Sequence, residues 1–199
     1  VRDFIRSQGF TGVGGGRFFI NGVDTTTRGV DVVFSWPMNM GEAGKFDFTL
    51  AGNFTDTEVT RVPATAQLSA LNPAPPLFDR INVLSLEQGQ PENKINANVN
   101  WKLGQWGATV RATRYGKVLS PGTTAALDFT MGAQTVVDLE ARYALTPKLN
   151  LAVGADNVFD EYPDSLPPGL NTTGNAPFAN YAPYGRAGRF IYARASYAF

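Results

Sequence analysis

Two carboxylates at alternate positions, Asp138 and Glu140, are the residues of this 199-residue chain whose types and spacing first suggest chemistry. On a β-strand they would share one face about 7 Å apart, as a general acid and a general base can. Arg142 continues the row and Arg111 is expected to face it, so the pattern favours the alternative of paired charges on a hydrated wall. The chain has no His and no Cys, which removes the commonest general base and any thiolate site. We therefore predict no enzyme, no metal site and no cofactor.

A glycine-rich segment at 9–16, with the sequence G-F-T-G-V-G-G-G, is the other motif with potential chemistry. It lacks the Lys-Ser/Thr pair and the following helical pattern of a phosphate-binding loop, so we interpret it as a flexible loop. The net charge is zero, which gives no indication of a nucleic-acid partner. The chain begins Val-Arg-Asp, with neither an initiator Met nor a signal peptide, so we expect it to be a piece of a longer chain.

Strict alternation of apolar and polar residues is the pattern that organises the chain, and it is typical of β-strands with two different faces. It is clearest in 189–199, where one face is apolar and ends in Phe199 while the other carries Arg194 and Ser196. The expected strands are 1–7 (as the end of a strand), 17–36, 45–56, 94–103, 106–115, 135–145, 149–159 and 189–199. The expected connections are a turn at 37–44, long loops at 57–92 and 160–187, and a medium loop at 116–132. Residues 77–86 of the first long loop are expected to form a short strand or a helical turn.

The connections alternate between long and short, as in outer-membrane barrels with short periplasmic turns and long extracellular loops. The aromatic residues of the apolar face also gather at the end where the short turns lie. They are Trp36, Trp101, Trp106, Tyr143, Tyr197 and Phe199. Interfacial girdles of this kind belong to membrane proteins, whereas a soluble β-sandwich has no reason to collect its Trp residues at one rim. We therefore predict an antiparallel transmembrane β-barrel meander with its apolar faces outward.

The polar face is predicted to line the barrel lumen. Its charged members are Arg111, Asp138, Glu140, Arg142, Asp156, Arg194 and Asp47. Loop 160–187 falls on the extracellular side and is rich in aromatic residues and Arg, which commonly anchor recognition surfaces. The ligand-contact candidates are Tyr162, Phe178, Tyr181, Tyr184 and Arg186. The alternative, that these side chains pack the loop on itself, is left equally open.

Five segments and the last strand resemble the C-terminal part of the TonB-dependent receptor family. The segments are T-T-R-G-V-D-V-V-F-S-W (26–36), L-A-G-N-F-T-D-T-E-V (50–59), Q-P-E-N-K-I-N-A-N-V-N-W (90–101), R-Y-G-K-V (114–118) and L-N-L-A-V-G-A-D-N-V-F-D-E-Y-P (149–163). The most specific part is the Asp-Asn-Val-Phe-Asp block at 156–160 together with the terminal aromatic strand. The resemblance runs from about residue 17 to 199.

The resemblance implies that 1–199 is about the last eight strands of a 22-stranded barrel, an N-terminally truncated fragment without its plug domain. It further implies a receptor in the Gram-negative cell outer membrane that imports a scarce small-molecule ligand, such as a ferric siderophore, with energy from TonB. The implied partners are membrane lipid, TonB through the missing N-terminal part, and the barrel-assembly machinery through the last strand. The alternative is a complete eight-stranded barrel with a structural or adhesive role, which pairing of the first and last strands would distinguish.

Overall fold

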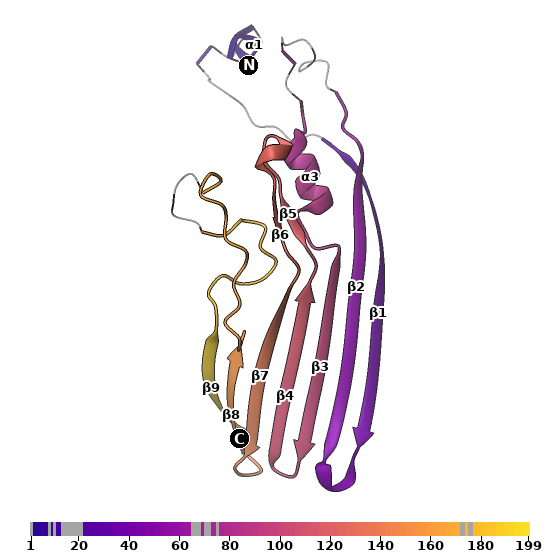
Figure 1. Ribbon diagram of the computed structural model, residues 1–199, viewed down its shortest axis with the longest axis vertical. Coiled ribbons are helices and arrows are strands. Elements are labelled where there is room, and N and C mark those ends of the chain that lie inside the picture. Colours follow the sequence, from indigo (N-terminus) through magenta and orange to yellow (C-terminus); the bar gives the residue numbers. More distant parts are fainter. Residues whose placement is uncertain are drawn as a thin grey trace.

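Seven strands form one antiparallel sheet in which each strand pairs with the next main strand along the chain (Figure 1). The computed structural model describes residues 2–7, 9, 11–12, 22–64, 69, 73–74, 76–171, 174 and 177–199. The sheet order is β1-β2-β3-β4-β7-β8-β9, and β5 and β6 form a separate small hairpin. The helices and strands are α1 (Arg2–Ser7), β1 (Asp24–Asn39), the 3-10 turn η1 (Gly41–Ala43), β2 (Lys45–Arg61), α3 (Arg80–Gln88), β3 (Asn93–Leu103), β4 (Trp106–Tyr115), β5 (Val118–Ser120), the 3-10 turn η2 (Ala125–Leu127), β6 (Phe129–Met131), β7 (Gln134–Ala144), β8 (Leu149–Asp156) and β9 (Phe190–Tyr197).

The register of the sheet keeps the predicted faces together across all seven strands. Phe46 of β2 lies opposite Trp101 of β3, and Trp101 lies opposite Ala108 of β4. Trp106 and Tyr143 are likewise directly opposed on β4 and β7. Because opposed residues point to the same face, the apolar sets share one surface and the polar sets the other. The predicted antiparallel meander is therefore confirmed.

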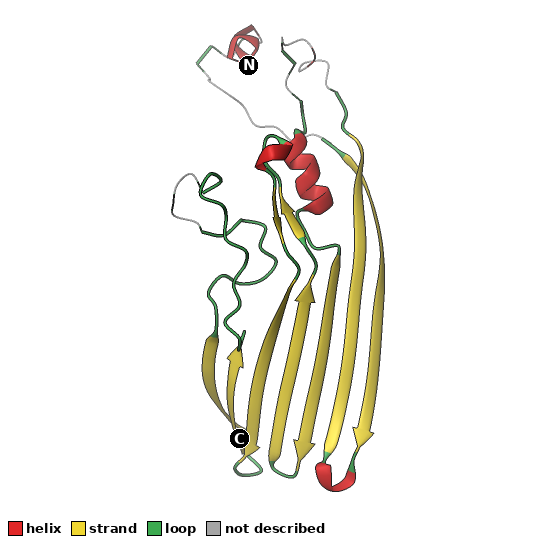
Figure 2. Cartoon of the chain, viewed as in Figure 1, coloured by secondary structure: helices red, strands yellow, loops and turns green. Residues whose placement is uncertain are grey.

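The two ends of the sheet differ as the connection lengths predict. The short connections, including η1, lie at one end, and the long loops with α3 and the hairpin lie at the other (Figure 2). Gly104 has a φ of 57°, a conformation that glycine adopts without strain and that closes the turn between β3 and β4. Among the described residues, no helix is long and apolar enough to cross a membrane.

The first segment differs from the prediction, because residues 2–7 form the helix α1 instead of the end of a strand. A helix satisfies its hydrogen bonds within the segment, whereas a strand requires a neighbour. No described strand pairs with 2–7, so local hydrogen bonding prevails. The predicted glycine loop at 9–16 and the start of the predicted strand at 17–36 lie largely outside the described residues.

Further strand ends and two loops also differ from the prediction. β1 continues through Pro37 to Asn39, so the proline lies inside the strand, two residues before its end. β2 continues to Arg61, five residues beyond its predicted end. In the loops, α3 takes the helical alternative, with the Asp79 side chain accepting a hydrogen bond from the Asn82 N–H at 2.9 Å. The predicted loop 116–132 contains the hairpin of β5 and β6.

The sheet remains open, since β1 and β9 lie at its two edges and do not pair in the described part of the chain. The alternative of a closed eight-stranded barrel is therefore wrong. A sandwich is also excluded for the part of the chain that the structure describes, because its other sheet is only the two-stranded hairpin of β5 and β6. The sheet is a fragment of a larger barrel wall.

The apolar core of the described residues lies among the loops and not under the sheet. Val118, Met131 and Ala179 are 2–3% exposed, and they come from β5, β6 and the loop that follows β8. The partly buried residues around them are Phe129, Leu166, Tyr181 and Ala182. The outward side chains of the sheet are exposed instead, as Ile191 at 73% shows.

Candidate functional site

A polar groove of about 590 Å³ runs across the concave face of the sheet. Side chains from β2, β3, β4, β7, β8 and β9 all contribute to it, so the wall is curved around this face. The lining residues are Thr49, Asn96, Asn98, Asn100, Thr109, Arg111, Asp138, Leu139, Glu140, Arg142, Asp156, Tyr192 and Arg194. Of the seven charged residues predicted for the lumen, Asp47 does not line the groove. The other six are in this set. Three are basic and three acidic, so the groove carries both signs without a net charge.

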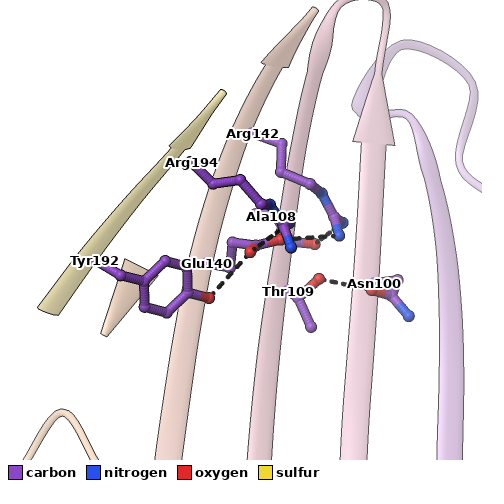
Figure 3. A network of polar contacts seen from close by, with 7 residues as sticks. All are labelled: Asn100, Ala108, Thr109, Glu140, Arg142, Tyr192 and Arg194. Atoms are coloured by element: carbon purple, nitrogen blue, oxygen red, sulfur yellow. Dashed lines mark hydrogen bonds and ion pairs between the residues drawn. The ribbon is translucent and has the colours of Figure 1, made fainter. Parts of the chain in front are cut away.

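Glu140 is the centre of the contacts in this groove (Figure 3). Its Oε2 accepts hydrogen bonds from the Arg194 guanidinium at 2.9 Å and from the Tyr192 hydroxyl at 3.0 Å. Its Oε1 lies 3.3 Å from Nη1 of Arg142. The Glu140 side chain is only 13% exposed, whereas those of Arg142 and Arg194 are 40% and 58% exposed. The carboxylate therefore lies deep in the wall, and the guanidinium groups cover it.

Small residues on β8 make this arrangement possible. Tyr192 and Arg194 are on β9 and Glu140 is on β7, with β8 between them. The β8 residues opposite Tyr192 and Arg194 are Gly154 and Ala152. Because neither carries a long side chain, the two β9 side chains reach across β8 to the carboxylate. Tyr192 was not among the predicted lumen residues, although its alternation with Arg194 places it on the same face.

Asp138 is also paired, so the two carboxylates do not act as an acid and base pair. Its Oδ2 lies 3.8 Å from Nη1 of Arg111, the residue directly opposite on β4. Its Oδ1 accepts a hydrogen bond from the Asn157 N–H at 2.9 Å. Both carboxylates are thus held by cations or backbone donors, which is the arrangement of a hydrated wall with paired charges. Among the described residues, no group of three or more acidic side chains is placed to hold a metal ion.

The convex face carries the six predicted aromatic residues at the end of the sheet with the short turns. The rings of Trp106 and Tyr143 have centroids 4.6 Å apart, and those of Tyr197 and Phe199 are 5.3 Å apart. The Trp101 indole N–H donates to the Ala43 carbonyl at 2.8 Å. Trp36 stands 6.1 Å from the ring of Phe48 on the neighbouring strand. The rings thus form a row along one rim, and the indole N–H of Trp101 is directed to the turn.

The five ligand-contact candidates in the loop after β8 mainly contact other parts of the protein. The Tyr181 hydroxyl lies 2.8 Å from the Ser85 hydroxyl of α3, and its ring packs on the small core. The Tyr184 hydroxyl donates to the Tyr162 carbonyl, and burial, followed by the nearby carboxylates of Asp164 and Glu161, raises the pKa of Tyr184 to about 12.

The other three candidates also make contacts within the loop. The rings of Tyr162 and Phe178 are stacked at 5.9 Å, and Nη2 of Arg186 donates to the Ala179 carbonyl at 2.8 Å. Tyr162 remains 44% exposed and Arg186 is exposed. These two therefore retain surface that a further molecule can reach, while Tyr181 contributes to the packing of the loops.

An ion pair that the sequence did not predict joins α3 to the connection between β5 and β6. Both Nη atoms of Arg80 donate to the Asp128 carboxylate, at 2.6 and 2.8 Å, and Nη1 also donates to the Gly122 carbonyl. The hydrogen bonds from Arg80 and from the Gly122 N–H lower the pKa of Asp128 to about 2. The partners are 48 residues apart, and no local pattern marks them as a pair.

Comparison with known proteins gives a family for this arrangement. Residues 1–158 match the family model described as "TonB dependent receptor-like, beta-barrel". No sequence among the curated proteins matches the chain. The matched residues cover well over half of the chain and include every main strand except β9.

Solved structures share the fold at low sequence identity. The ferric yersiniabactin uptake receptor FyuA from Yersinia pestis is 16% identical with a TM-score of 0.57, over 90% of this chain and 24% of FyuA. The copper transporter OprC is 14% identical with a TM-score of 0.55, over 89% of this chain and 23% of OprC. Pseudomonas aeruginosa FpvA, solved with bound pyoverdines, is 15% identical with a TM-score of 0.53, over 86% of this chain and 19% of FpvA.

The chain thus spans about a quarter or less of the length of these structures. By their descriptions, the family is one of receptors, and these neighbours are receptors and a transporter. The open meander, its polar concave wall and the family match lead to one assignment: this chain belongs to the TonB-dependent receptor family and forms part of its β-barrel.

Proposed function

We propose that the chain forms part of the barrel wall of an outer-membrane receptor that takes up a scarce small-molecule ligand, such as a ferric siderophore, with energy supplied through TonB. The observation that carries the proposal is the match of residues 1–158 to the receptor family. The two faces of the sheet support it, since an apolar convex face suits lipid and a polar concave face suits a water-filled or plugged lumen. The protein then lies in the cell outer membrane of a Gram-negative bacterium.

A growth and uptake experiment tests this function in the organism that carries the gene. Deleting the gene is expected to reduce accumulation of radioactive iron supplied as one of three chelates: a catecholate, a hydroxamate or a pyoverdine. Restoring the gene should restore uptake, and disabling TonB should abolish it again. The proposal fails if uptake of all three iron chelates is unchanged by the deletion, or if the restored uptake is independent of TonB.

Ligand contact is proposed for the exposed part of the loop after β8. Tyr162 and Arg186 are accessible there, and aromatic and arginine side chains are common anchors of recognition surfaces. Tyr162→Ala and Arg186→Gln are each expected to weaken binding of the transported chelate roughly tenfold, the loss of one good contact. Tyr143→Phe, at the opposite end of the sheet, is the matched control. Unchanged affinity in both loop variants would assign these residues to loop packing alone.

Two further contacts follow from the proposed location. The aromatic row on the convex rim would lie at the boundary between hydrocarbon and water, where such rings are stable. The last strand, with its apolar face and terminal Phe199, would be recognised by the barrel-assembly machinery during insertion. Both roles concern lipid and assembly partners and are independent of which ligand is carried.

A further inference from the structure

The turn after β8 contains two residues with a positive φ, a backbone conformation that residues other than glycine rarely adopt. Asn157 has a φ of 51° and Asp160 a φ of 62°. Asn is tolerated in this region better than most residues, but the conformation persists only where the surroundings fix it. Asn157 is also 8% exposed, so its amide group must be satisfied inside the protein.

The Asn157 side chain is satisfied by Glu161 of the same turn. Its Nδ2 donates to the Glu161 carbonyl at 2.7 Å, and its Oδ1 accepts from the Glu161 N–H at 2.9 Å. The backbone is tied to β7 as well, because the Asn157 N–H donates to Asp138 and the Val158 N–H donates to the Val137 carbonyl. The side chain therefore holds the turn in its conformation, and the turn's backbone N–H groups attach it to the rim of the sheet.

Asp160 holds the other end of the same loop. Its Oδ1 accepts a hydrogen bond from the Arg189 N–H at 2.8 Å, immediately before β9 begins. The Arg189 guanidinium donates back to the Val158 carbonyl at 3.3 Å. Gly188 has a φ of 71°, which favours glycine, and a Cβ there would come within 2.2 Å of the Tyr162 hydroxyl and 2.5 Å of Asp160 Oδ1. The two ends of a loop of about thirty residues are thus joined at one point.

The loop is also joined to the two structures beside it. Its Asp164 accepts a hydrogen bond from the Gly132 N–H at 2.7 Å, at the end of β6, and its Ala179 completes the core of Val118 and Met131. Tyr181 reaches Ser85 of α3, and α3 is held to the hairpin region by Arg80 and Asp128. Each of the three parts therefore contacts the other two.

We propose that α3, the β5–β6 hairpin and the loop after β8 form one preassembled cap, and that Asn157 and Asp160 are the positioning residues that clamp it to the sheet. The 156–160 block that resembles the family then has a structural explanation, because its Asn and Asp supply the turn and both ends of the clamp. The cap is a fixed surface above these strands and not a set of independent lids. This proposal concerns loop geometry and does not depend on the identity of a ligand.

Hydrogen–deuterium exchange on the purified full-length receptor in detergent tests the proposal without any ligand. Asn157→Gly removes the side-chain hydrogen bonds but keeps a residue that adopts the required φ freely. The two lost bonds predict exchange roughly thirtyfold faster in 161–171 and 177–189, and in the hairpin at the same time. Asn157→Asp keeps the acceptor for the Glu161 N–H, so its exchange rate in the loop should lie between those of Asn157→Gly and the unaltered protein. Asn150→Gly, near the opposite end of β8, is the matched control and should leave the cap unchanged.

Two outcomes overturn the proposal. Exchange in the loop that stays within threefold of the unaltered protein in Asn157→Gly would show that the amide does not clamp it. Faster exchange in the loop with an unchanged hairpin would show that the parts do not form one cap. If Asn157→Gly yields no folded receptor, Arg80→Gln provides the test from the other side. It should accelerate exchange in α3, the hairpin and the loop together, and acceleration in α3 alone would contradict the single cap.

Discussion

A side-chain clash predicted at Gly154 offers the most direct test of the wall network. A Cβ at this position would lie 2.4 Å from Cζ and 2.5 Å from the hydroxyl oxygen of Tyr192, and 2.9 Å from the Leu139 carbonyl oxygen. Ordinary contact begins near 3.4 Å, so the Tyr192 ring would have to move by about 1 Å. That movement would break its 3.0 Å hydrogen bond to Glu140.

The magnitude follows from these contacts. Overpacking of this kind costs about 1–3 kcal/mol, and the lost hydrogen bond adds about 1 kcal/mol. We therefore expect Gly154→Ala to lower the free energy of unfolding by about 2–4 kcal/mol. In the double variant with Tyr192→Ala the ring is absent, so most of the alanine's cost disappears. The two substitutions should then be coupled by about 1–2 kcal/mol, with the double variant more stable than the sum predicts.

Urea unfolding of the full-length receptor in detergent micelles, followed by Trp fluorescence, measures these differences as shifts of the midpoint at a common slope. Tyr192→Phe is the matched control, because it removes the hydroxyl and keeps the ring carbon at 2.4 Å. It should relieve the Gly154→Ala defect much less than Tyr192→Ala does. The predicted clash would be refuted if the losses of stability from Gly154→Ala and Tyr192→Ala add to within about 0.5 kcal/mol in the double variant. It would also be refuted if Tyr192→Phe and Tyr192→Ala relieve the Gly154→Ala defect equally.

Three further predictions concern the ends of the sheet. The pKa of Asp128 is lowered to about 2, so its ion pair with Arg80 stabilises the cap fully at pH values above the ordinary pKa of 3.8 and is lost as the pH falls through about 2. Proteolysis of the hairpin should therefore increase between pH 4 and pH 2. Asp128→Asn should abolish this pH dependence. Trp106→Ala removes the ring pair with Tyr143, which contributes about 0.5–1.5 kcal/mol in addition to the burial of apolar area. The substitution should lower the unfolding temperature in lipid vesicles, whereas a substitution in an exposed turn should not. Removing Phe199 should reduce the yield of receptor in the outer membrane without changing its synthesis, and normal insertion would contradict a role of the terminal aromatic in assembly.

Alternation alone was sufficient to predict which side chains share a face. Arg111, Glu140 and Arg194 were assigned to one face from their position in the sequence, and all three line the groove. This works because side chains alternate with a period of two, so a register that exposes one apolar residue exposes the whole set. The segment 1–7 shows the limit, since a short stretch without a long alternating pattern does not reveal whether a neighbouring strand will pair with it.

The loops were harder to predict because their contacts join segments distant in the chain. The Asp79 cap is a local signal for the start of α3, yet the helix and strand alternatives remained open for 77–86. The hairpin of β5 and β6 has only three residues in each strand, too few for alternation to be recognised. Tyr181 illustrates the consequence, because its role in the core depends on β5, β6 and α3 together.

The sequence by itself determined the antiparallel meander, the polar and apolar faces and the family, because these follow from a short repeat and from local motifs. The tertiary structure decided which groups meet. It placed Gly154 where Tyr192 crosses to Glu140, paired Arg80 with Asp128 and joined Asp160 to Arg189. Such pairs depend on the order and register of strands and on the paths of long loops. Alternation specifies the face of a residue but not its partner on the next strand.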